Sequence, residues 1–160
     1  MIKKNYYILA GIILILLAVV LVFTSRNGCI KKDHATCRVH VDGNTLKLKV
    51  AYSTEAQEHG LMGVTALLED TGMIFVYESP QYLSFWMKNT LIPLSIAFVE
   101  SDGKISSIYD MYPQPGVKDS ELSIYPSHAQ VKYAIEVPLG WFSLKDIKRN
   151  SYIKIPKELQ

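Results

Sequence analysis

The chain has 160 residues, 49% of them hydrophobic, and its 17 Lys and Arg nearly balance its 15 Asp and Glu. Lys3 and Lys4 precede a long apolar run, leaving 15 of the 17 basic residues to balance the acidic ones. This length favours a single domain. A protein that holds a phosphate backbone needs a strongly basic face, so the balance argues against nucleic acid as a partner.

The apolar run covers residues 6–23, which contain no charge and no strongly polar side chain. A helix over this run would be about 27 Å long, just enough for a hydrocarbon core of roughly 30 Å. Because Lys3 and Lys4 precede the run, the positive-inside tendency places residues 1–5 in the cytoplasm. Basic residues also follow the run and weaken this orientation. We therefore predict a contact with the membrane through residues 6–23.

Two interpretations of this leader stay open, an uncleaved anchor and a cleaved secretory signal. The run is longer than the apolar region of most signal peptides, and Thr24-Ser25-Arg26 is a poor cleavage site, which favours the anchor. Both interpretations place the remainder of the chain outside the cytoplasm. We expect a single-pass membrane protein in which residues 24–36 are a tether and residues 37–157 are one periplasmic or extracellular domain.

The two cysteines, Cys29 and Cys37, admit two interpretations. In an oxidising compartment they would form a disulfide, worth about 2–3 kcal/mol at most because its loop is short. Otherwise they are two free thiols near the membrane. His34 and His40 could add metal donors, but the spacing matches no structural zinc pattern. We expect no metal and no cofactor.

Alternating apolar and polar residues open the domain and predict a hairpin with strands over 37–41 and 45–52. Asp42-Gly43 tolerates the positive φ of its tight turn. A short helix is predicted over 53–60, with Thr54 and Gln57 forming a capping box and Gly60 ending it.

The rest of the chain predicts mostly strands. They are expected over residues 72–77, 82–88, 94–100, 104–111, 130–137 and 151–155. A helical turn is expected over 64–68, and a helix over 138–148 with Trp141, Leu144 and Ile147 facing the core. The Pro-rich stretch 112–127 is expected to be a functional or mobile loop. Together these elements indicate an α+β domain, mainly antiparallel, with about seven or eight strands in a curled sheet or partly open barrel and one or two short helices.

The most unusual stretch is Phe85-Trp86-Met87-Lys88-Asn89-Thr90-Leu91-Ile92-Pro93-Leu94. In a strand, Trp86 and Lys88 share one face about 7 Å apart, while Phe85 and Met87 face the core. An indole beside an ammonium, an amide and a hydroxyl suits a polar ligand with a ring or sugar face. The alternative is structural, with Trp86 filling the core and Lys88 reaching solvent.

The chain resembles one family through several blocks in order and spacing. They are Gly60-Leu61-Met62, Gly72-Met73-Ile74-Phe75, the stretch from Phe85 to Leu94, Asp102-Gly103-Lys104 and Ile135-Glu136-Val137-Pro138-Leu139-Gly140. The family is the one catalogued as domain of unknown function one-nine-two, and the resemblance covers residues 39–156. It implies a compact, mostly β domain behind a signal or anchor and carries no established activity. Relatives commonly have Asp after the Ile-Pro-Leu, where this chain has Ser95.

A catalytic alternative comes from Glu55 and His59, which lie one helical turn apart. With Lys88 they could supply acid–base groups for hydrolysis. The competing interpretation is an exposed helix whose C-terminal histidine favours the helix dipole. Nucleophile motifs such as Gly-x-Ser-x-Gly are absent from the sequence. Met62, Met73 and Met87 lie in apolar settings, which favours core packing over a copper site.

The sequence therefore predicts a membrane-anchored extracytoplasmic binding or accessory module for a small polar ligand, a glycan or an envelope protein, with residues 112–127 as a lid. The candidate ligand-binding residues are His59, Trp86, Lys88, Asn89, Thr90 and Ser95. The alternative is an envelope-acting hydrolase that uses His59, Glu55 and Lys88.

Overall fold

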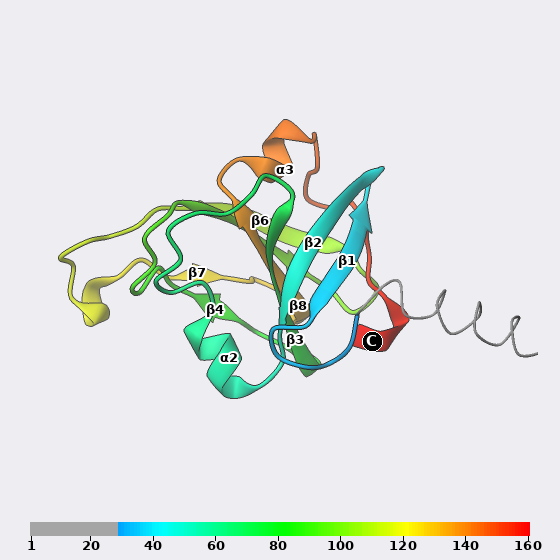
Figure 1. Cartoon of the computed structure of the whole chain (residues 1–160), viewed down its shortest axis with the longest axis horizontal. Helices are drawn as coiled ribbons and strands as arrows, with labels where there is room; N and C mark the ends of the chain where they lie inside the picture. The colour runs from blue at the N-terminus through cyan, green and yellow to red at the C-terminus, as the bar shows by residue number, and fades with distance from the viewer. Residues whose placement is uncertain (1–28) are drawn as a thin grey trace, which may run out of the picture.

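A computed structural model describes residues 29–160 (Figure 1). The predicted anchor at 6–23, the cytoplasmic residues 1–5 and the start of the tether lie outside these residues. Within 29–160, none of the helices has the length and apolar character needed to cross a bilayer.

The described elements follow one another in this order: β1 (Thr36–Val41), β2 (Asn44–Ala51), α2 (Thr54–His59), β3 (Thr71–Gln81), β4 (Ser84–Phe85), β5 (Leu94–Val99), β6 (Ile105–Met111), η1 (Asp119–Glu121), β7 (Tyr125–Pro126), β8 (Val131–Pro138), α3 (Trp141–Leu144), β9 (Ile153–Lys154) and η2 (Lys157–Leu159). Figure 1 shows α2, β4 and β7 together on one side of the molecule, with α3 at the other end of the view.

Seven strands form one curled sheet in the order β6-β5-β8-β3-β2-β1-β9, and β4 pairs with β7 separately. Every pair in the large sheet is antiparallel except β2–β3, where α2 lies on the connection between parallel strands. The two edges meet at one end, because Ile105 N–H donates to Ser151 O at 2.9 Å and Ile153 N–H donates to Gly103 O at 2.8 Å. The prediction of a mainly antiparallel, curled sheet is confirmed.

The hairpin that opens the domain forms as predicted. Asp42 and Gly43 have φ values of 45° and 78°, the positive φ that a tight two-residue turn requires. Cys37, Val39 and Val41 are buried while the residues between them are exposed. Alternation therefore sets which face of β1 enters the core.

The inner face of the curled sheet encloses the larger apolar core. Side chains from β1, β2, β3, β5, β6, β8 and β9 meet there, and Trp141, Phe142 and Leu159 pack against them. The disulfide between Cys29 and Cys37 lies in this core, with their Cα atoms 4.4 Å apart. Of the two interpretations left open by the sequence, the disulfide is the one found.

The outer face of β3, β8, β5 and β6 carries a second, smaller core. It is covered by α2, the turn at Leu61 and the segment 83–92, which contribute Ala56, Leu83 and Met87 among others. The predicted strand over 82–88 is reduced to β4, because only Ser84 and Phe85 find a backbone partner, in β7. The residues after β4 leave the sheet pattern and form a wall over this face.

The helix α2 begins differently from the prediction. Ser53, not Thr54, is its N-cap and accepts a hydrogen bond from Ala56 N–H at 3.1 Å. Gln57 forms no capping box, because its amide donates to Tyr52 O and Val76 O and so fastens α2 to β3. Gly60, with φ of 52°, ends the helix as predicted.

Two other helical predictions need correction. The helical turn over 64–68 is wrong, since that stretch has no regular structure. The helix predicted over 138–148 is only the four-residue α3, and Leu144 is 78% exposed instead of facing the core. Asp146 has φ of 56°, so the chain turns before the helical period can bring Leu144 inward. Phe142 takes the buried position that Leu144 was expected to fill.

Candidate functional site

A cleft of about 640 Å³ opens on the outer face of the sheet. Its floor is formed by β3 and β8, one wall by α2 with the turn that follows it, and the other wall by residues 84–90. The cleft therefore lies between the two segments that the sequence marked for function, the predicted catalytic helix and the Phe-Trp-Met-Lys-Asn-Thr stretch. Its size suits a small-molecule ligand.

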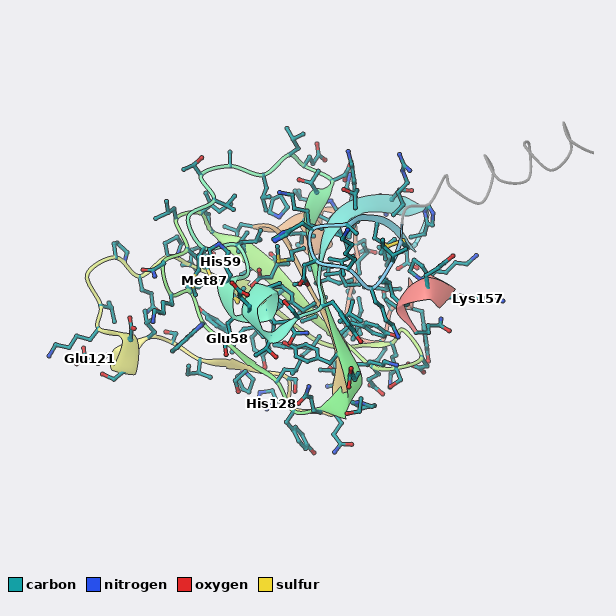
Figure 2. All side chains as sticks on the ribbon, turned by 60° about the horizontal axis from the view of Figure 1, so that its bottom comes forward. Glu58, His59, Met87, Glu121, His128 and Lys157 are labelled. Carbon is teal, nitrogen blue, oxygen red and sulfur yellow. A yellow bond between two sulfur atoms is a disulfide. The ribbon has the colours of Figure 1, made fainter. Side chains whose placement is uncertain are left out.

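The helix wall carries the predicted acid–base residues. Glu55, Glu58 and His59 are exposed on α2 and line the cleft. Figure 2 labels Glu58 and His59 on this helix, while Glu121 lies at the tip of the loop that holds η1 and His128 elsewhere. No hydrogen bond joins His59 to Glu55 among the described residues. The structure brings these groups to one cleft without fixing them to one another.

The opposite wall presents Trp86, which is 42% exposed, and Lys88. The Lys88 ammonium lies 5.4 Å from the centre of the Trp86 ring and 2.7 Å from Asp119 on η1. The loop 112–127 is thus held against this wall by an ion pair. Trp86 is not core filler, and Lys88 does not simply reach solvent.

A row of aromatic rings holds this wall against the sheet. Phe85 packs edge-to-face on Phe75 of β3 at 4.8 Å and on Phe98 of β5 at 5.6 Å between ring centres. The row continues from Phe98 to Tyr109 and on to Tyr125 of β7. Edge-to-face pairs add roughly 0.5–1.5 kcal/mol each beyond their area burial. Phe85 turned inward is what lets its neighbour Trp86 face the cleft.

Glu136 of β8 is the most unusual group at the floor of the cleft. It is only 5% exposed, yet its carboxyl makes no hydrogen bond or ion pair with any residue in 29–160. A buried charge without a partner is costly, and burial raises the pKa of Glu136 to about 8. The carboxyl is therefore mostly protonated at neutral pH and available to a ligand.

Gly72 helps to place Glu136. A Cβ atom at Gly72 would collide with the backbone carbonyl of Glu136 and crowd the side chain of Leu48. Only glycine lets β8 lie this close to the start of β3. The Glu136 side chain then projects from the outer face, beside Met73 on β3 and Ile96 on β5.

Tyr77 of β3 is the second polar group at the floor. Burial, and then the negative charge of Glu136, raise the pKa of Tyr77 to about 12. The phenol stays neutral at physiological pH and can donate a hydrogen bond into the cleft. Its hydroxyl has no hydrogen-bond partner within the described residues.

The remaining predicted residues are divided between this cleft and other places. Thr90 lines the cleft, whereas Asn89 lines a neighbouring cleft of about 290 Å³ against residues 113–117. Ser95 is buried away from both clefts, where it donates to the Asp110 carboxylate and accepts from Gly140 N–H at 2.8 Å. The geometry gives Ser95 a structural position on the inner side of the sheet.

Sequence reasoning did not single out Glu136 or Tyr77. The signal for Glu136 was a lone carboxylate in the apolar strand Ala134-Ile135-Glu136-Val137, where both faces should be buried. Tyr77 was placed only as the last residue of the strand predicted over 72–77. Among residues 29–160, no group of three or more His, Cys, Asp or Glu side chains is placed to hold a metal ion.

The model of the family DUF192, described as an uncharacterised ACR, matches residues 37–155. The chain belongs to the DUF192 family. None of the curated proteins shows significant similarity to it. The DUF192 match spans the sheet, the cleft and the Cys37 half of the disulfide.

Two solved structures resemble this DUF192 domain. One is a Sinorhizobium meliloti protein provisionally described as a transcription regulator, with 27% identity and a TM-score of 0.68 over 77% of this chain and 95% of that one. The other is a Novosphingobium aromaticivorans protein of unknown function, with 27% identity and a TM-score of 0.68 over 76% of this chain and 86% of that one.

Proposed function

We propose that this protein is a binding module whose outer-face cleft holds a small polar ligand. The observation that carries the proposal is Glu136, a buried carboxyl that opens on a 640 Å³ cleft and has no partner within the described chain. None of the described side chains leaves a buried nitrogen or oxygen without a partner, so the Glu136 oxygens reach the cleft and are open to a partner that the ligand brings. Aromatic rings with a few convergent polar groups are typical of such sites.

The fluorescence of Trp86 offers a direct test. Trp86 is 42% exposed and Trp141 only 1%, so acrylamide should quench Trp86 alone in the full-length chain. A ligand in the cleft should suppress this quenching. A panel of sugars, polyols, amines and carboxylates, followed by small-molecule extracts of the cell envelope, would be screened in this way, with Trp86→Phe as the control that removes the signal.

Paired variants locate the binding surface. Lys88→Ala should alter ligand affinity, because Lys88 and Trp86 form one wall of the cleft, while Asn89→Ala should leave binding unchanged because Asn89 lines the neighbouring cleft. Both variants should fold. The proposal fails if no member of the panel or the extracts protects Trp86.

The proposal includes a place for the module, outside the cytoplasm and held at the membrane by residues 6–23. The apolar run supports this, as does the Cys29–Cys37 disulfide, since disulfides persist mainly in oxidising compartments. Protease added to intact cells or spheroplasts should digest the domain and leave a membrane-bound N-terminal fragment. A fully protected domain would contradict this placement.

A second candidate function is hydrolysis of envelope material. It is favoured by the convergence of Glu55, His59 and Lys88 on one cleft, and by a Glu136 pKa of about 8, in the range of general acids. Turnover of ester, glycan or peptide substrates that falls with His59→Ala would support it. The balanced charge of this chain gives no strong attraction to DNA, which argues against the regulator role described for the S. meliloti protein.

A further inference from the structure

The ionisable groups of the cleft are predominantly acidic. Three carboxyl groups line it, Glu55 and Glu58 on α2 and Glu136 on the floor, against His59 and Lys88. The Lys88 charge is already engaged, because its ammonium lies 2.7 Å from the Asp119 carboxylate. Glu136 is mostly protonated in the empty cleft, so the negative charge that an entering ligand meets comes from Glu55 and Glu58, and this charge attracts cations and repels anions.

The apolar part of the lining is mostly aromatic, with Leu61 and Met62 as the other apolar members. Phe75, Tyr77, Phe85 and Trp86 all contribute surface to the cleft. The faces of aromatic rings carry partial negative charge and attract cations, most strongly in the case of tryptophan. The Trp86 ring already has one cation near it, the Lys88 ammonium at 5.4 Å. Acidic groups and ring faces thus favour the same kind of ligand.

We propose that the cleft selects a small organic molecule with a protonated primary amine, whose ammonium group hydrogen-bonds to the Glu136 carboxylate among the aromatic rings. This rests on the proposed binding function and names its ligand class. An ammonium brings three donors and a positive charge, the two things that the unpartnered Glu136 carboxyl lacks. A neutral hydroxyl would supply a donor without the charge, and an anion would supply neither.

Ionisation of Glu136 must then accompany binding. Burial holds the pKa of Glu136 near 8, so at pH 7 the empty cleft contains a mostly protonated carboxyl. An ammonium stabilises the carboxylate, so its binding should release about one proton at pH 7. The other titratable groups facing this carboxyl from the surrounding elements are Tyr77 on β3, Glu55, Glu58 and His59 on α2, and Lys88. The His59 imidazole lines the same cleft, so it has a control of its own.

The test uses isothermal titration calorimetry on the full-length chain with three probes of matched shape: phenethylamine, phenethyl alcohol and hydrocinnamate. Phenethylamine should bind roughly tenfold or more tightly than the alcohol, which is the affinity ratio expected from one charge-assisted hydrogen bond. Hydrocinnamate should not bind. Repeating the titration at pH 7 in buffers of different ionisation enthalpy should reveal the released proton. Proton release on phenethylamine binding should be unchanged in the His59→Gln variant.

Glu136→Gln should lower the affinity for phenethylamine about tenfold or more and abolish proton release. Glu158→Gln, a change to an exposed glutamate on η2, is the matched control and should alter neither. Far-UV circular dichroism would confirm that Glu136→Gln is folded. If it is not, the Glu55→Gln/Glu58→Gln double variant replaces it and should weaken amine binding several-fold without affecting phenethyl alcohol.

The outcomes separate this inference from the proposed function. Equal or tighter binding of the alcohol or the carboxylate would overturn the amine class and leave a binding cleft in place. Amine binding without proton release would overturn the role of Glu136. So would an amine affinity that stays unchanged in Glu136→Gln or, where that variant does not fold, in the Glu55→Gln/Glu58→Gln double variant. If none of the probes binds, the amine inference fails, whereas the binding function fails only if the wider Trp86 screen is also negative.

Discussion

The inner and outer faces of the curled sheet differ in whether their buried polar side chains have hydrogen-bond partners. On the inner side, Ser95 donates to Asp110 and accepts from Gly140, and the Trp141 indole donates to Asp70 at 2.9 Å. On the outer face, Glu136 is 5% exposed and has no such partner in the described chain. The polar groups of the inner side are paired within the chain, while the Glu136 carboxyl on the outer face is left open to the cleft. Such a group has a stability cost that function would explain.

The largest expected effect separates the two tryptophans. Trp141→Ala should lower the free energy of unfolding by about 3–5 kcal/mol, because it empties a fully buried site on the inner side. Trp86→Ala should cost roughly 1 kcal/mol or less, because Trp86 is 42% exposed at the cleft. Urea unfolding followed by circular dichroism measures both. Comparable losses of unfolding free energy in the two variants would mean that Trp86 belongs to the core.

The next effect depends on pH and on Glu136. Unfolded Glu136 has a pKa near 4.5, and burial raises it to about 8, so the folded chain keeps a proton that the unfolded chain has lost. This contribution to stability is complete below pH 4.5 and disappears as pH rises towards 8, by about 1.4 kcal/mol for each pH unit. Glu136→Gln should therefore gain stability relative to the wild type as pH rises through this range.

Urea unfolding at pH 5, 6.5 and 8 would measure that difference, with Glu158→Gln as the control. Plotted against pH, the unfolding free energy of Glu136→Gln should diverge from that of the wild type. The plot for Glu158→Gln should stay parallel to that of the wild type. Parallel curves for both variants would show that the Glu136 carboxyl is solvated or paired, and the contrast between the two faces would disappear.

On the inner side, Ser95→Ala should lower the free energy of unfolding by about 1–3 kcal/mol, because the Gly140 N–H loses its buried acceptor. Ligand binding at the cleft should be unaffected, since Ser95 does not line it. Unfolding and Trp86 quenching on the same sample would test both statements. Loss of binding with full stability would return Ser95 to the candidate site.

The smallest effect concerns the loop 112–127. Lys88→Met breaks the ion pair with Asp119, which is largely solvent-exposed and worth about 0.2–1 kcal/mol at most. Hydrogen–deuterium exchange should nevertheless rise in residues 113–122. Lys104→Met, which breaks the exposed pair with Glu100, is the matched control and should leave that loop unchanged. Unchanged exchange in Lys88→Met would show that other contacts hold the loop.

Much of this contrast could be predicted from local patterns. Alternation placed the hairpin strands correctly, because Cys37, Val39 and Val41 are spaced by the pleat itself. The same period assigned Trp86 and Lys88 to one face, and both line the cleft. Leu144 was predicted wrongly because a helical period has meaning only where the helix continues, and α3 ends after four residues.

Other features depend on contacts between distant segments. Glu136 becomes unusual only when α2, β3 and residues 84–90 close around it, and no pattern within β8 contains that information. Ser95 lost its place in the candidate site because Asp110 and Gly140, far along the chain, meet it on the other side of the sheet. The parallel pairing of β2 with β3 could not be predicted from a local pattern either, since it depends on the path of the connection that contains α2.

The disulfide has a mechanical consequence. Cys37 lies in β1, which pairs with β2 over its whole length and with β9 at its far end. Tension applied to the chain ahead of Cys29 passes through the sulfur–sulfur bond into β1 and bypasses the residues between the two cysteines. Those residues cannot be pulled straight while the bond is intact, and reduction would turn a rigid attachment into a compliant one.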